Sequence, residues 1–309
     1  MIKKTLYFGN PAYLSLRNGQ LVIKLPDVEN NDSLPQLIKK ESERTIPIED
    51  IGVVVLDNKR ITITTGAIEA LLDNNSAFIS CDDKGMPVGM MLPLVGNTLR
   101  NERFRDQLSA SLPLQKNLWQ QTVRQKIANQ CKVLKRYANA ETKCMQRWSA
   151  DVRSGDTENI EARAAAYYWK NIFTDIPDFV RGREEAPPNN LLNYGYAILR
   201  AVMARALVGS GLLPTLGIHH HNRYNAYCLA DDIMEPYRPY VDELVLQIME
   251  DNDYSVLTLQ LKAKLLQIPV LDVTISGKRS PLMIAAGLTS ASLYKCFSGE
   301  SRQILYPAM

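Results

Sequence analysis

The sequence predicts an α+β fold in which a small N-terminal β-rich domain precedes a larger all-α C-terminal domain. Two different residue patterns along the 309 residues support this prediction. Up to about residue 95, short β-branched and alternating apolar runs lie between turn residues, which is typical of strands. From about residue 99, long segments place apolar residues three and four positions apart, which is typical of helices. We therefore expect one domain at residues 1–95 and another at 99–309, joined by a linker near 93–98.

The β-rich half divides into several strands and one short helix. Asn18-Gly19 separates the alternating runs YLSL and LVIKL, and Asn-Gly favours the positive φ angles of a two-residue hairpin turn. IGVVVL and ITITT are β-branched runs that predict two further strands. AIEALLDNN, after Gly66, predicts a helix, and SAFISCD predicts a returning strand with a turn at Asp83-Lys84-Gly85. GMPVG then breaks the strand pattern.

The second half contains five long segments with helical spacing. Each combines good helix formers with apolar residues at three- and four-residue intervals. Pro187 and Pro188 end one helical pattern, and Asn189-Asn190 precedes the next. The segments are LWQQTVRQKIANQCKVLKRYA, NIEARAAAYYWKNIF, LLNYGYAILRAVMARALVGSG, VDELVLQIMED and PLMIAAGLTSASLYKCF.

The composition excludes several classes of protein. It is 46% hydrophobic and 22% charged, as in ordinary globular proteins. No apolar run approaches the roughly 18 residues of a membrane span, and the N-terminus lacks the apolar core of a secretory signal. We therefore expect a cytoplasmic protein without membrane contact. The five cysteines show no CxxC spacing, which argues against a zinc knuckle and a disulfide framework.

The net charge of +3 says little about nucleic acid, but its distribution is uneven. Between Leu99 and Tyr137, nine basic residues face only two acidic ones. Such an excess attracts a phosphate backbone, although a solvated helix face has the same composition. The basic residues are Arg100, Arg103, Arg105, Lys116, Arg124, Lys126, Lys132, Lys135 and Arg136.

All three histidines of the chain are consecutive, in the stretch GIHHHNRYN. Neutral imidazole binds metals. Neighbouring side chains point to opposite sides of a strand and about 100° apart on a helix, so three in a row cannot face one point. One of His219, His220 and His221 is therefore a candidate ligand, and the others are expected to pack or to contact phosphate.

Three acidic residues are candidates to join that histidine. On a helix, Glu161 shares a face with Ala165 and Tyr168, where another element can approach the carboxylate. The alternative is an exposed glutamate that interacts with the helix dipole. Asp232 and Glu235 are three residues apart and share a face if helical. The alternative is a capping box with Asp232 as the N-cap.

The candidate histidine and acidic residues lie in long sequence segments whose combination is specific. NIEARAAAYYW, NNLLNYGYAILRAVMARAL and GLLPTLGIHHHNRYNAYCLADDIMEPYRPYVDELV, with the β-rich half, resemble the CRISPR-associated integrase family, the Cas-one endonucleases of spacer acquisition. The similarity extends over essentially the whole chain and looks closest to the type II branch. It implies that Glu161, His220 and Glu235 ligate a divalent metal and are catalytic. Histidines on both sides of His220 leave a one-residue register slip open. Asp232 matches an acid with accessory roles.

The resemblance also implies a chemistry and a set of partners. Oxygen ligands with one imidazole suit Mg²⁺ or Mn²⁺ better than zinc. The implied enzyme is a metal-dependent DNA endonuclease and integrase that inserts spacers into a CRISPR array by attack of a DNA 3′-hydroxyl. Implied partners are double-stranded DNA (the incoming spacer and the repeat), a second copy bound through the β domain, a small ferredoxin-like companion protein that bridges two dimers, and other type II CRISPR proteins. Candidate DNA contacts are Asn222, Arg223, Asn225 and Arg238.

Alternatives remain open at this point. The chain could be a non-catalytic DNA-binding scaffold of an adaptation complex, or a metallohydrolase that acts on small phosphoesters. Tyr168 is an alternative nucleophile, as in tyrosine recombinases, but the expected arginine and histidine surroundings are missing. Asn193 and Tyr194 support either the site or the core. Arg238 could pair with Asp232 instead of holding phosphate.

Overall fold

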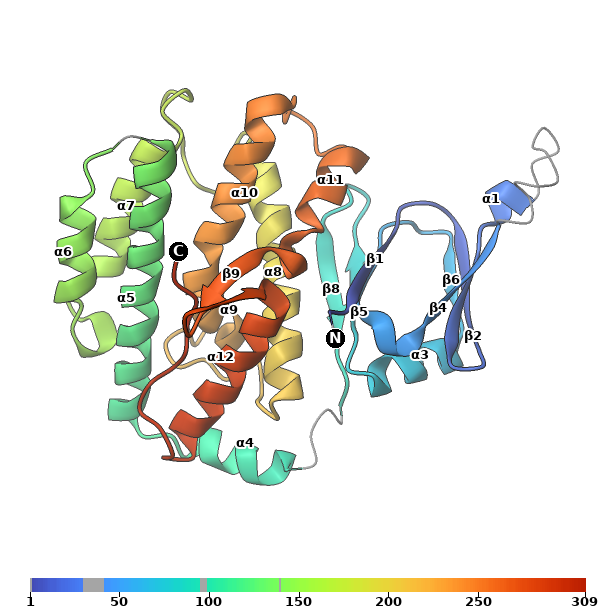
Figure 1. Ribbon diagram of the computed structural model, residues 1–309, viewed down its shortest axis with the longest axis horizontal. Coiled ribbons are helices and arrows are strands. Elements are labelled where there is room, and N and C mark those ends of the chain that lie inside the picture. Colours follow the sequence, from blue (N-terminus) through green and yellow to red (C-terminus); the bar gives the residue numbers. More distant parts are fainter. Residues whose placement is uncertain (1, 30–41, 95–98, 139) are drawn as a thin grey trace. The chain divides into compact units, whose positions relative to one another are not determined.

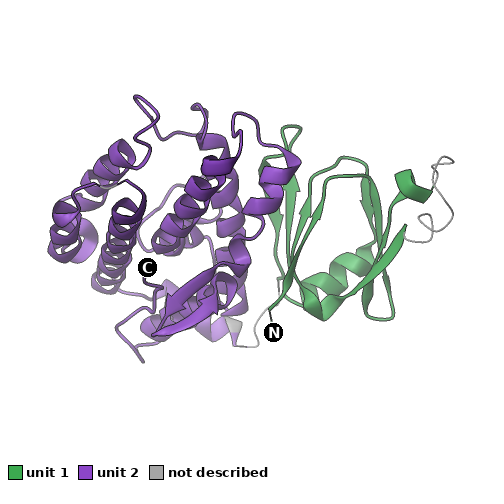
Figure 2. Ribbon diagram, turned by 45° about the horizontal axis from the view of Figure 1, so that its top comes forward, with its two compact units in different colours: residues 1–96 green, residues 97–309 purple. Residues whose placement is uncertain are grey.

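The computed structural model describes residues 2–29, 42–94, 99–138 and 140–309. These form two compact units, Met1–Gly96 and Asn97–Met309 (Figure 2). The predicted linker at residues 93–98 spans this division, and its residues 95–98 lie outside the described part of the chain. A role of the first unit in dimerisation stays a prediction.

Within its described residues, the first unit contains two four-stranded sheets (Figure 1). One has the spatial order β1 (Lys4–Phe8), β5 (Ile51–Leu56), β7 (Ala77–Cys81), β8 (Pro87–Met91), and the other β4 (Glu43–Pro47), β3 (Gln20–Lys24), β2 (Ala12–Arg17), β6 (Ile61–Ile63). Parallel pairs join β1 to β5, β5 to β7 and β2 to β6. The short helices are α1 (Pro26–Glu29), η1 (Ile48–Asp50) and α3 (Thr65–Asp73). Ala67 and Leu71 of α3 are fully buried in the core of this unit.

The predicted hairpin at Asn18-Gly19 is confirmed, because β2 and β3 pair antiparallel and both turn residues have positive φ. The predicted helix begins one residue before Gly66, since the Thr64 side chain accepts a hydrogen bond from Ala67 N. The expectation that GMPVG breaks the strand pattern is wrong. Those residues enter β8, which pairs antiparallel with β7, and a proline is tolerated at the first position of an edge strand.

The second unit is mainly helical, and the predicted fold class is confirmed (Figure 1). All five predicted long segments form helices. The elements are α4 (Arg100–Leu108), α5 (Leu112–Tyr137), α6 (Lys143–Asp151), η2 (Ser154–Asp156), α7 (Ile160–Ile172), α8 (Asn189–Gly209), α9 (Cys228–Met234), η3 (Glu235–Tyr237), α10 (Arg238–Asp251), α11 (Leu259–Leu265), η4 (Ile268–Val270) and α12 (Leu282–Phe297).

One segment departs from the predicted all-α architecture. β9 (Asp272–Ile275) and β10 (Lys278–Pro281) form an antiparallel hairpin whose turn residues, Ser276 and Gly277, have positive φ. Ser-Gly between two short polar-apolar runs is a hairpin signal that the helical spacing of the neighbouring segments obscured.

Helix α8 runs through the core of the second unit, in contact with α9, α10, α11 and α12. Its length and composition would suffice to cross a membrane, which the sequence reading missed, but 72% of the apolar window is buried inside the fold. Core helices of globular proteins share this composition, so α8 is weak evidence for a membrane.

Helix α5 positions the functional region, because it contacts α7, α9 and η3. The buried Asn129 side chain of α5 donates hydrogen bonds to the carbonyl oxygens of Pro236, 2.7 Å away, and Pro307, 3.1 Å away. These bonds hold η3, which begins with Glu235, against the middle of α5.

Candidate active site

Two of the predicted ligands meet at a lysine. The Nζ atom of Lys126, on α5, lies 2.6 Å from Oε1 of Glu161 and 2.6 Å from Oε2 of Glu235. Lys126 is buried, with 8% of its surface exposed. Burial alone would lower the pKa of Lys126, but the charges of Glu235 and Glu161 outweigh it and raise that pKa. The two carboxylates therefore favour the charged form of the lysine that lies between them.

Glu161 lies in the first turn of α7 and faces α5. The Asp156 carboxylate caps this helix by accepting hydrogen bonds from the backbone amides of Ile160 and Glu161, both at 2.9 Å. The Glu161 carboxylate therefore does not cap the helix, and it reaches Lys126. The alternative of a solvent-facing glutamate is wrong, since only 21% of the side chain is exposed.

Glu235 begins η3, directly after α9, and is almost completely buried. Its Oε1 lies 2.8 Å from Nε of Arg238. Burial acts to raise the pKa of Glu235, but the charges of Arg238 and Lys126 outweigh it and lower that pKa. Among the described residues, its Oε2 has no hydrogen-bond partner of good geometry, and the Lys126 ammonium lies 2.6 Å away. A buried, ionised oxygen with an open lone pair suits a metal ligand.

Asp232 lies inside α9 with no exposed surface. Its carboxylate accepts hydrogen bonds from the backbone amides of Ile218 at 2.7 Å and His219 at 2.9 Å. The capping-box alternative is therefore wrong, because Asp232 binds the preceding loop instead of starting a helix. A Cβ atom on Gly217 would lie 2.3 Å from the His220 carbonyl oxygen, so this tight loop requires glycine there.

The same carboxylate orients His220. The Nδ1 atom of the ring lies 2.5 Å from Oδ1 of Asp232, which leaves Nε2 for another partner. Metal-binding histidines commonly have this arrangement. The hydrogen bond to Asp232 is the largest cause that raises the pKa of His220 above its ordinary value, and the charges of Glu235 and Glu161 act in the same direction.

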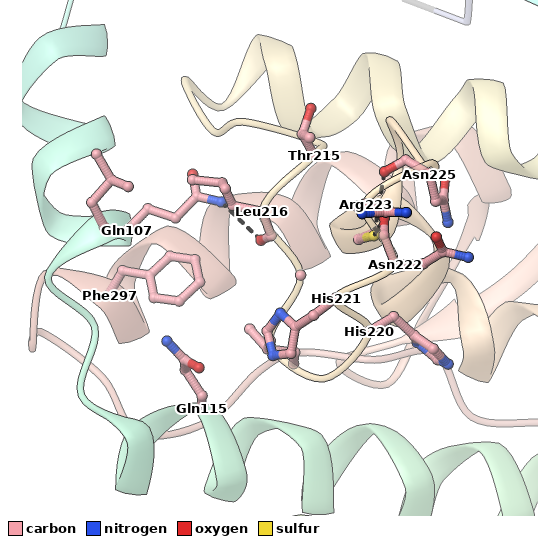
Figure 3. Close-up of a pocket in the computed structure, with 14 residues that line it drawn as sticks. Gln107, Gln115, Thr215, Leu216, His220, His221, Asn222, Arg223, Asn225 and Phe297 are labelled. Atoms are coloured by element: carbon pink, nitrogen blue, oxygen red, sulfur yellow. Dashed lines mark hydrogen bonds between the residues drawn. The ribbon is translucent and has the colours of Figure 1, made fainter.

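The neighbouring histidines have other surroundings. The His219 ring stacks on Trp119 of α5 with 4.1 Å between centroids, and burial lowers the pKa of His219. In Figure 3 the rings of His220 and His221 point in different directions. This agrees with the expectation that three consecutive imidazoles cannot face one point.

The three predicted ligands do not form a complete metal-holding set. Across the described residues, no three His, Cys, Asp or Glu side chains are arranged to hold one metal ion. Glu161 and Glu235 are brought together at Lys126, and His220 is close enough to influence the pKa of Glu235. The residue types and open atoms fit a divalent cation, but the Lys126 ammonium lies between the two carboxylates.

A cavity of about 380 Å³ lies beside His220, between the histidine loop, Gln107 and Phe297 (Figure 3). Asn222 and Arg223, two predicted DNA contacts, line it and are exposed. Asn225 also lines it, but its amide donates to Asp231 at 2.7 Å.

Arg238, the fourth predicted DNA contact, is held within the protein. It binds Glu235 and lies over the Tyr196 ring, 4.6 Å from the centroid. The alternative pairing of Arg238 with Asp232 is not formed, because its close acidic partner is Glu235.

The basic stretch of α4 and α5 has several internal roles. Arg103 donates to the Ser210 carbonyl at 2.7 Å, Arg124 to that of Val152 at 2.8 Å, and Arg136 pairs with Glu243 at 2.8 Å. Members with exposed surfaces that these bonds do not involve include Arg105, Lys116, Lys132 and Lys135.

Two of the remaining candidates, Tyr168 and Tyr194, belong to the interior. Tyr168 is fully buried and donates to Asp242 at 2.9 Å, and burial raises its pKa well above the ordinary value, which removes it as a nucleophile. Tyr194 is also fully buried. Asn193 accepts from Arg181 at 2.8 Å and donates to the Arg183 carbonyl. The core interpretation therefore holds for Tyr194, whereas Asn193 is half-buried and binds the segment that precedes α8.

Comparison with known proteins decides the family. The model of the family described as CRISPR associated protein Cas1 matches residues 6–256. The chain belongs to the Cas1 family. A CRISPR-associated endonuclease Cas1 from Neisseria meningitidis is 37% identical over 82% of this chain and 78% of its own length. A Cas1 endonuclease from Pyrobaculum aerophilum is 30% identical over 69% and 76%.

Solved structures share the Cas1 fold. A casposase bound to integration product has a TM-score of 0.75 and 22% identity over 98% of this chain and 92% of that chain. A Cas6-RT-Cas1–Cas2 complex has a TM-score of 0.72 and 20% identity over 97% of this chain and 35% of that chain. At these identities, the likeness establishes the fold alone.

From the sequence, the part that Lys126 plays was missed, because Lys126 was treated as one of nine basic residues that either attract phosphate or form a solvated helix face. A signal was present in the spacing of α5. Lys126 stands in a line of buried residues three and four apart, and a lysine in such an apolar stripe predicts a buried ion pair. The line is Trp119, Val123, Lys126, Gln130 and Val133.

Proposed function

We propose that this Cas1 protein is a DNA endonuclease and integrase that depends on Mg²⁺ or Mn²⁺ and inserts short foreign DNA into a CRISPR array. The main support is one observation. Two acids from separate helical elements converge on one buried cation, beside a histidine that Asp232 orients by its Nδ1 atom. Both relatives described above are named CRISPR-associated endonucleases.

In this proposal, Glu161, Glu235 and Nε2 of His220 hold the metal. The bound metal would polarise a phosphodiester and stabilise the charge on the attacking and leaving oxygens. Asp232 keeps the imidazole in one orientation by accepting a hydrogen bond from Nδ1. Arg238 keeps Glu235 ionised, as the lowered pKa of that carboxyl requires. The attacking group is a DNA 3′-hydroxyl, so no covalent protein nucleophile takes part.

The proposed partners follow from the same function. Double-stranded DNA, as incoming spacer and as CRISPR repeat, would contact Arg223 and Asn222 at the cavity mouth and the exposed lysines of α5. We also propose a homodimer formed through the β unit, a small ferredoxin-like protein that bridges two dimers, and association with other type II CRISPR proteins in the cytoplasm. The Cas6-RT-Cas1–Cas2 complex among the similar structures supports an assembly of this kind.

The test is strand transfer of a short duplex into a repeat-bearing plasmid with Mg²⁺ or Mn²⁺ and the companion protein. Glu161→Ala should abolish joining. Glu158→Ala is the matched control, because Glu158 is half-exposed and pairs with Arg153 at 3.2 Å near the same helix. Joining that survives Glu161→Ala unchanged would overturn the assignment.

A second candidate is a DNA-binding scaffold without catalysis. The absence of a complete three-ligand set among the described residues favours it. Under this alternative the protein binds repeat DNA with ordinary salt dependence, yet joins no strands with any divalent ion. Its DNA affinity would also be insensitive to Mn²⁺.

A further inference from the structure

We propose that Lys126 is a built-in cation that holds the two metal-binding carboxylates together and that a divalent metal must displace. This inference rests on the proposed function and deepens it. Lys126 would then be a positioning residue that sets the affinity of the site for metal and couples metal binding to DNA.

The geometry prevents the Lys126 ammonium and a metal ion from occupying the space between the two carboxylates at the same time. Nζ lies 2.6 Å from an oxygen of Glu161 and 2.6 Å from an oxygen of Glu235. An Mg²⁺ ion approaches its oxygen ligands to about 2.1 Å. A metal that binds both oxygens must therefore enter the space between the carboxylates that the ammonium now takes.

The charges lead to the same conclusion. Glu161 and Glu235 carry two negative charges, and Lys126 and Arg238 carry two positive charges, so the cluster is balanced. The lysine side chain is 10% exposed and the Glu235 side chain 7%, so an excess of charge would be costly. A divalent cation would raise the charge of this balanced cluster to +2. Departure of the ammonium lowers that excess to +1, which the negative charge of a bound DNA phosphate offsets.

The inference has a measurable consequence for affinity. When only a fraction of the population is competent to bind, the apparent dissociation constant is the intrinsic constant divided by that fraction, so binding is weaker. Removal of Lys126 should therefore tighten metal binding in the absence of DNA. A lysine with a purely structural role would give the opposite result, because loss of its charge would let the carboxylates separate or protonate.

The first experiment measures Mn²⁺ binding to the full chain by electron paramagnetic resonance at pH 8, without DNA. Lys126→Met and Lys126→Gln should both bind Mn²⁺ more tightly than the wild type, by roughly 5- to 150-fold, the usual range of coupling between sites. Lys170→Met, on the exposed side of α7, is the matched control and should not change the affinity. Unchanged or weaker binding by both Lys126 variants would overturn the inference.

Melting temperatures of the same preparations show whether the Lys126 variants are folded. Without metal, Lys126→Met should melt at a lower temperature than the wild type, because two buried carboxylates lose their partner. Mn²⁺ should raise the melting temperature of Lys126→Met by more than it raises that of the wild type. If Lys126→Met does not fold, Lys126→Gln, which keeps a hydrogen-bond donor, carries the binding measurement.

A second experiment follows the amine itself. Reductive methylation of the wild type with ¹³C-formaldehyde, read by peptide mass spectrometry, should modify Lys126 faster with Mn²⁺ than with EDTA. Lys170 should react equally in both. Equal protection of Lys126 in both conditions would contradict displacement.

Failure of this inference is distinguishable from failure of the proposed function. If wild type and Glu161→Gln bind Mn²⁺ equally, the metal site itself is absent, and both proposals fall. If Glu161→Gln abolishes binding but the Lys126 variants do not bind more tightly, the metal site stands and only the displacement is wrong.

Discussion

At the residue scale, the Asp232 carboxylate ties the backbone amides of Ile218 and His219 and the Nδ1 atom of His220 to one buried point. A charge without exposed surface is stable only when such partners satisfy it. The loop geometry and the histidine orientation therefore depend on one side chain. His219 has a different support, the flat stack on Trp119.

An alanine scan of the three histidines tests the register. We expect His220→Ala to weaken Mn²⁺ binding at least tenfold, about 1.4 kcal/mol, because it removes the oriented imidazole. His219→Ala should lower the melting temperature slightly through loss of the stack, and His221→Ala should have little effect on either quantity. A severe loss of binding in His219→Ala instead would place the ligand one residue earlier.

The raised pKa of His220 predicts an acid limit for metal binding. Nε2 binds metal only when the ring is neutral, so Mn²⁺ binding should fall as the pH drops through the folded pKa, which lies above the ordinary value of about 6.5. For folding the sign is opposite. The stability from the His220–Asp232 pair is complete below the ordinary pKa and is lost as the pH rises through the folded pKa.

Asp232→Asn supplies the control for this pH dependence. The Asp232 charge and its hydrogen bond both raise the pKa of His220. The variant removes the charge and weakens the hydrogen bond, so the acid limit of Mn²⁺ binding should move to lower pH. Mn²⁺ affinity that stays constant from pH 8 to about pH 5 in the wild type would rule out His220 as a ligand.

At the element scale, the loop between α8 and α9 depends on a close approach at Gly217. An added Cβ atom would lie 2.3 Å from the His220 carbonyl oxygen and 2.8 Å from Oδ2 of Asp232. Gly217→Ala should therefore lower the free energy of unfolding by about 1–3 kcal/mol and weaken Mn²⁺ binding.

Gly287→Ala is the matched control, since its added Cβ in α12 would meet no described atom within 4 Å apart from the adjoining residues and backbone of its own helix. It should stabilise the protein by about 0.5–1 kcal/mol through its helix propensity. If both variants unfold at the same urea concentration, the loop is not constrained as described.

Asp242 links three helices. On α10, it accepts hydrogen bonds from Tyr168 of α7 and, at 2.5 Å, from Tyr196 of α8. Burial raises the pKa of Asp242 from 3.8 to about 6. The folded protein thus binds this proton more tightly than the unfolded chain, so its contribution to stability falls as the pH rises through that interval.

Asp242→Asn tests this linkage. At about 1.4 kcal/mol per pKa unit, the ionised Asp242 costs roughly 3 kcal/mol above pH 6. The stability of wild type relative to Asp242→Asn should therefore decrease as the pH rises from 3.8 to about 6 and level off above. Urea unfolding at several pH values measures it, and a constant difference would contradict the raised pKa.

At the scale of the whole molecule, a net charge of +3 conceals a functional division of the basic residues. Lys126 serves the interior, whereas Lys132 and Lys135 of the same helix are exposed. We expect the double variant Lys132→Ala/Lys135→Ala to bind duplex DNA more weakly. The slope of log K against log salt should fall by about 0.9 for each phosphate that the variant no longer neutralises.

Lys295→Ala, on the exposed side of α12, is the comparison for that measurement. It should leave the salt slope unchanged. An equal slope for the double variant and the wild type would show that α5 does not contact the DNA backbone.

The order and type of most elements could be predicted from the amino-acid sequence. Asn18-Gly19 predicts its hairpin because two positive φ angles are required locally, and the five long helices follow from apolar spacing. The family was also accessible, since long ordered strings carry it. The β9–β10 hairpin and β8 were missed because short strands with proline or polar residues depend on pairing more than on local preference.

How the acids and the histidine relate to one another emerged only from the folded chain. Glu161 and Glu235 are 74 positions apart in the sequence, and no periodicity reports that α7 and η3 meet on the same side of α5. The spacing of residues along the sequence also did not show that Lys126 is the cation that lies between Glu161 and Glu235. Charge balance in a buried space is a property of three-dimensional neighbours, whereas sequence patterns report the faces of single elements.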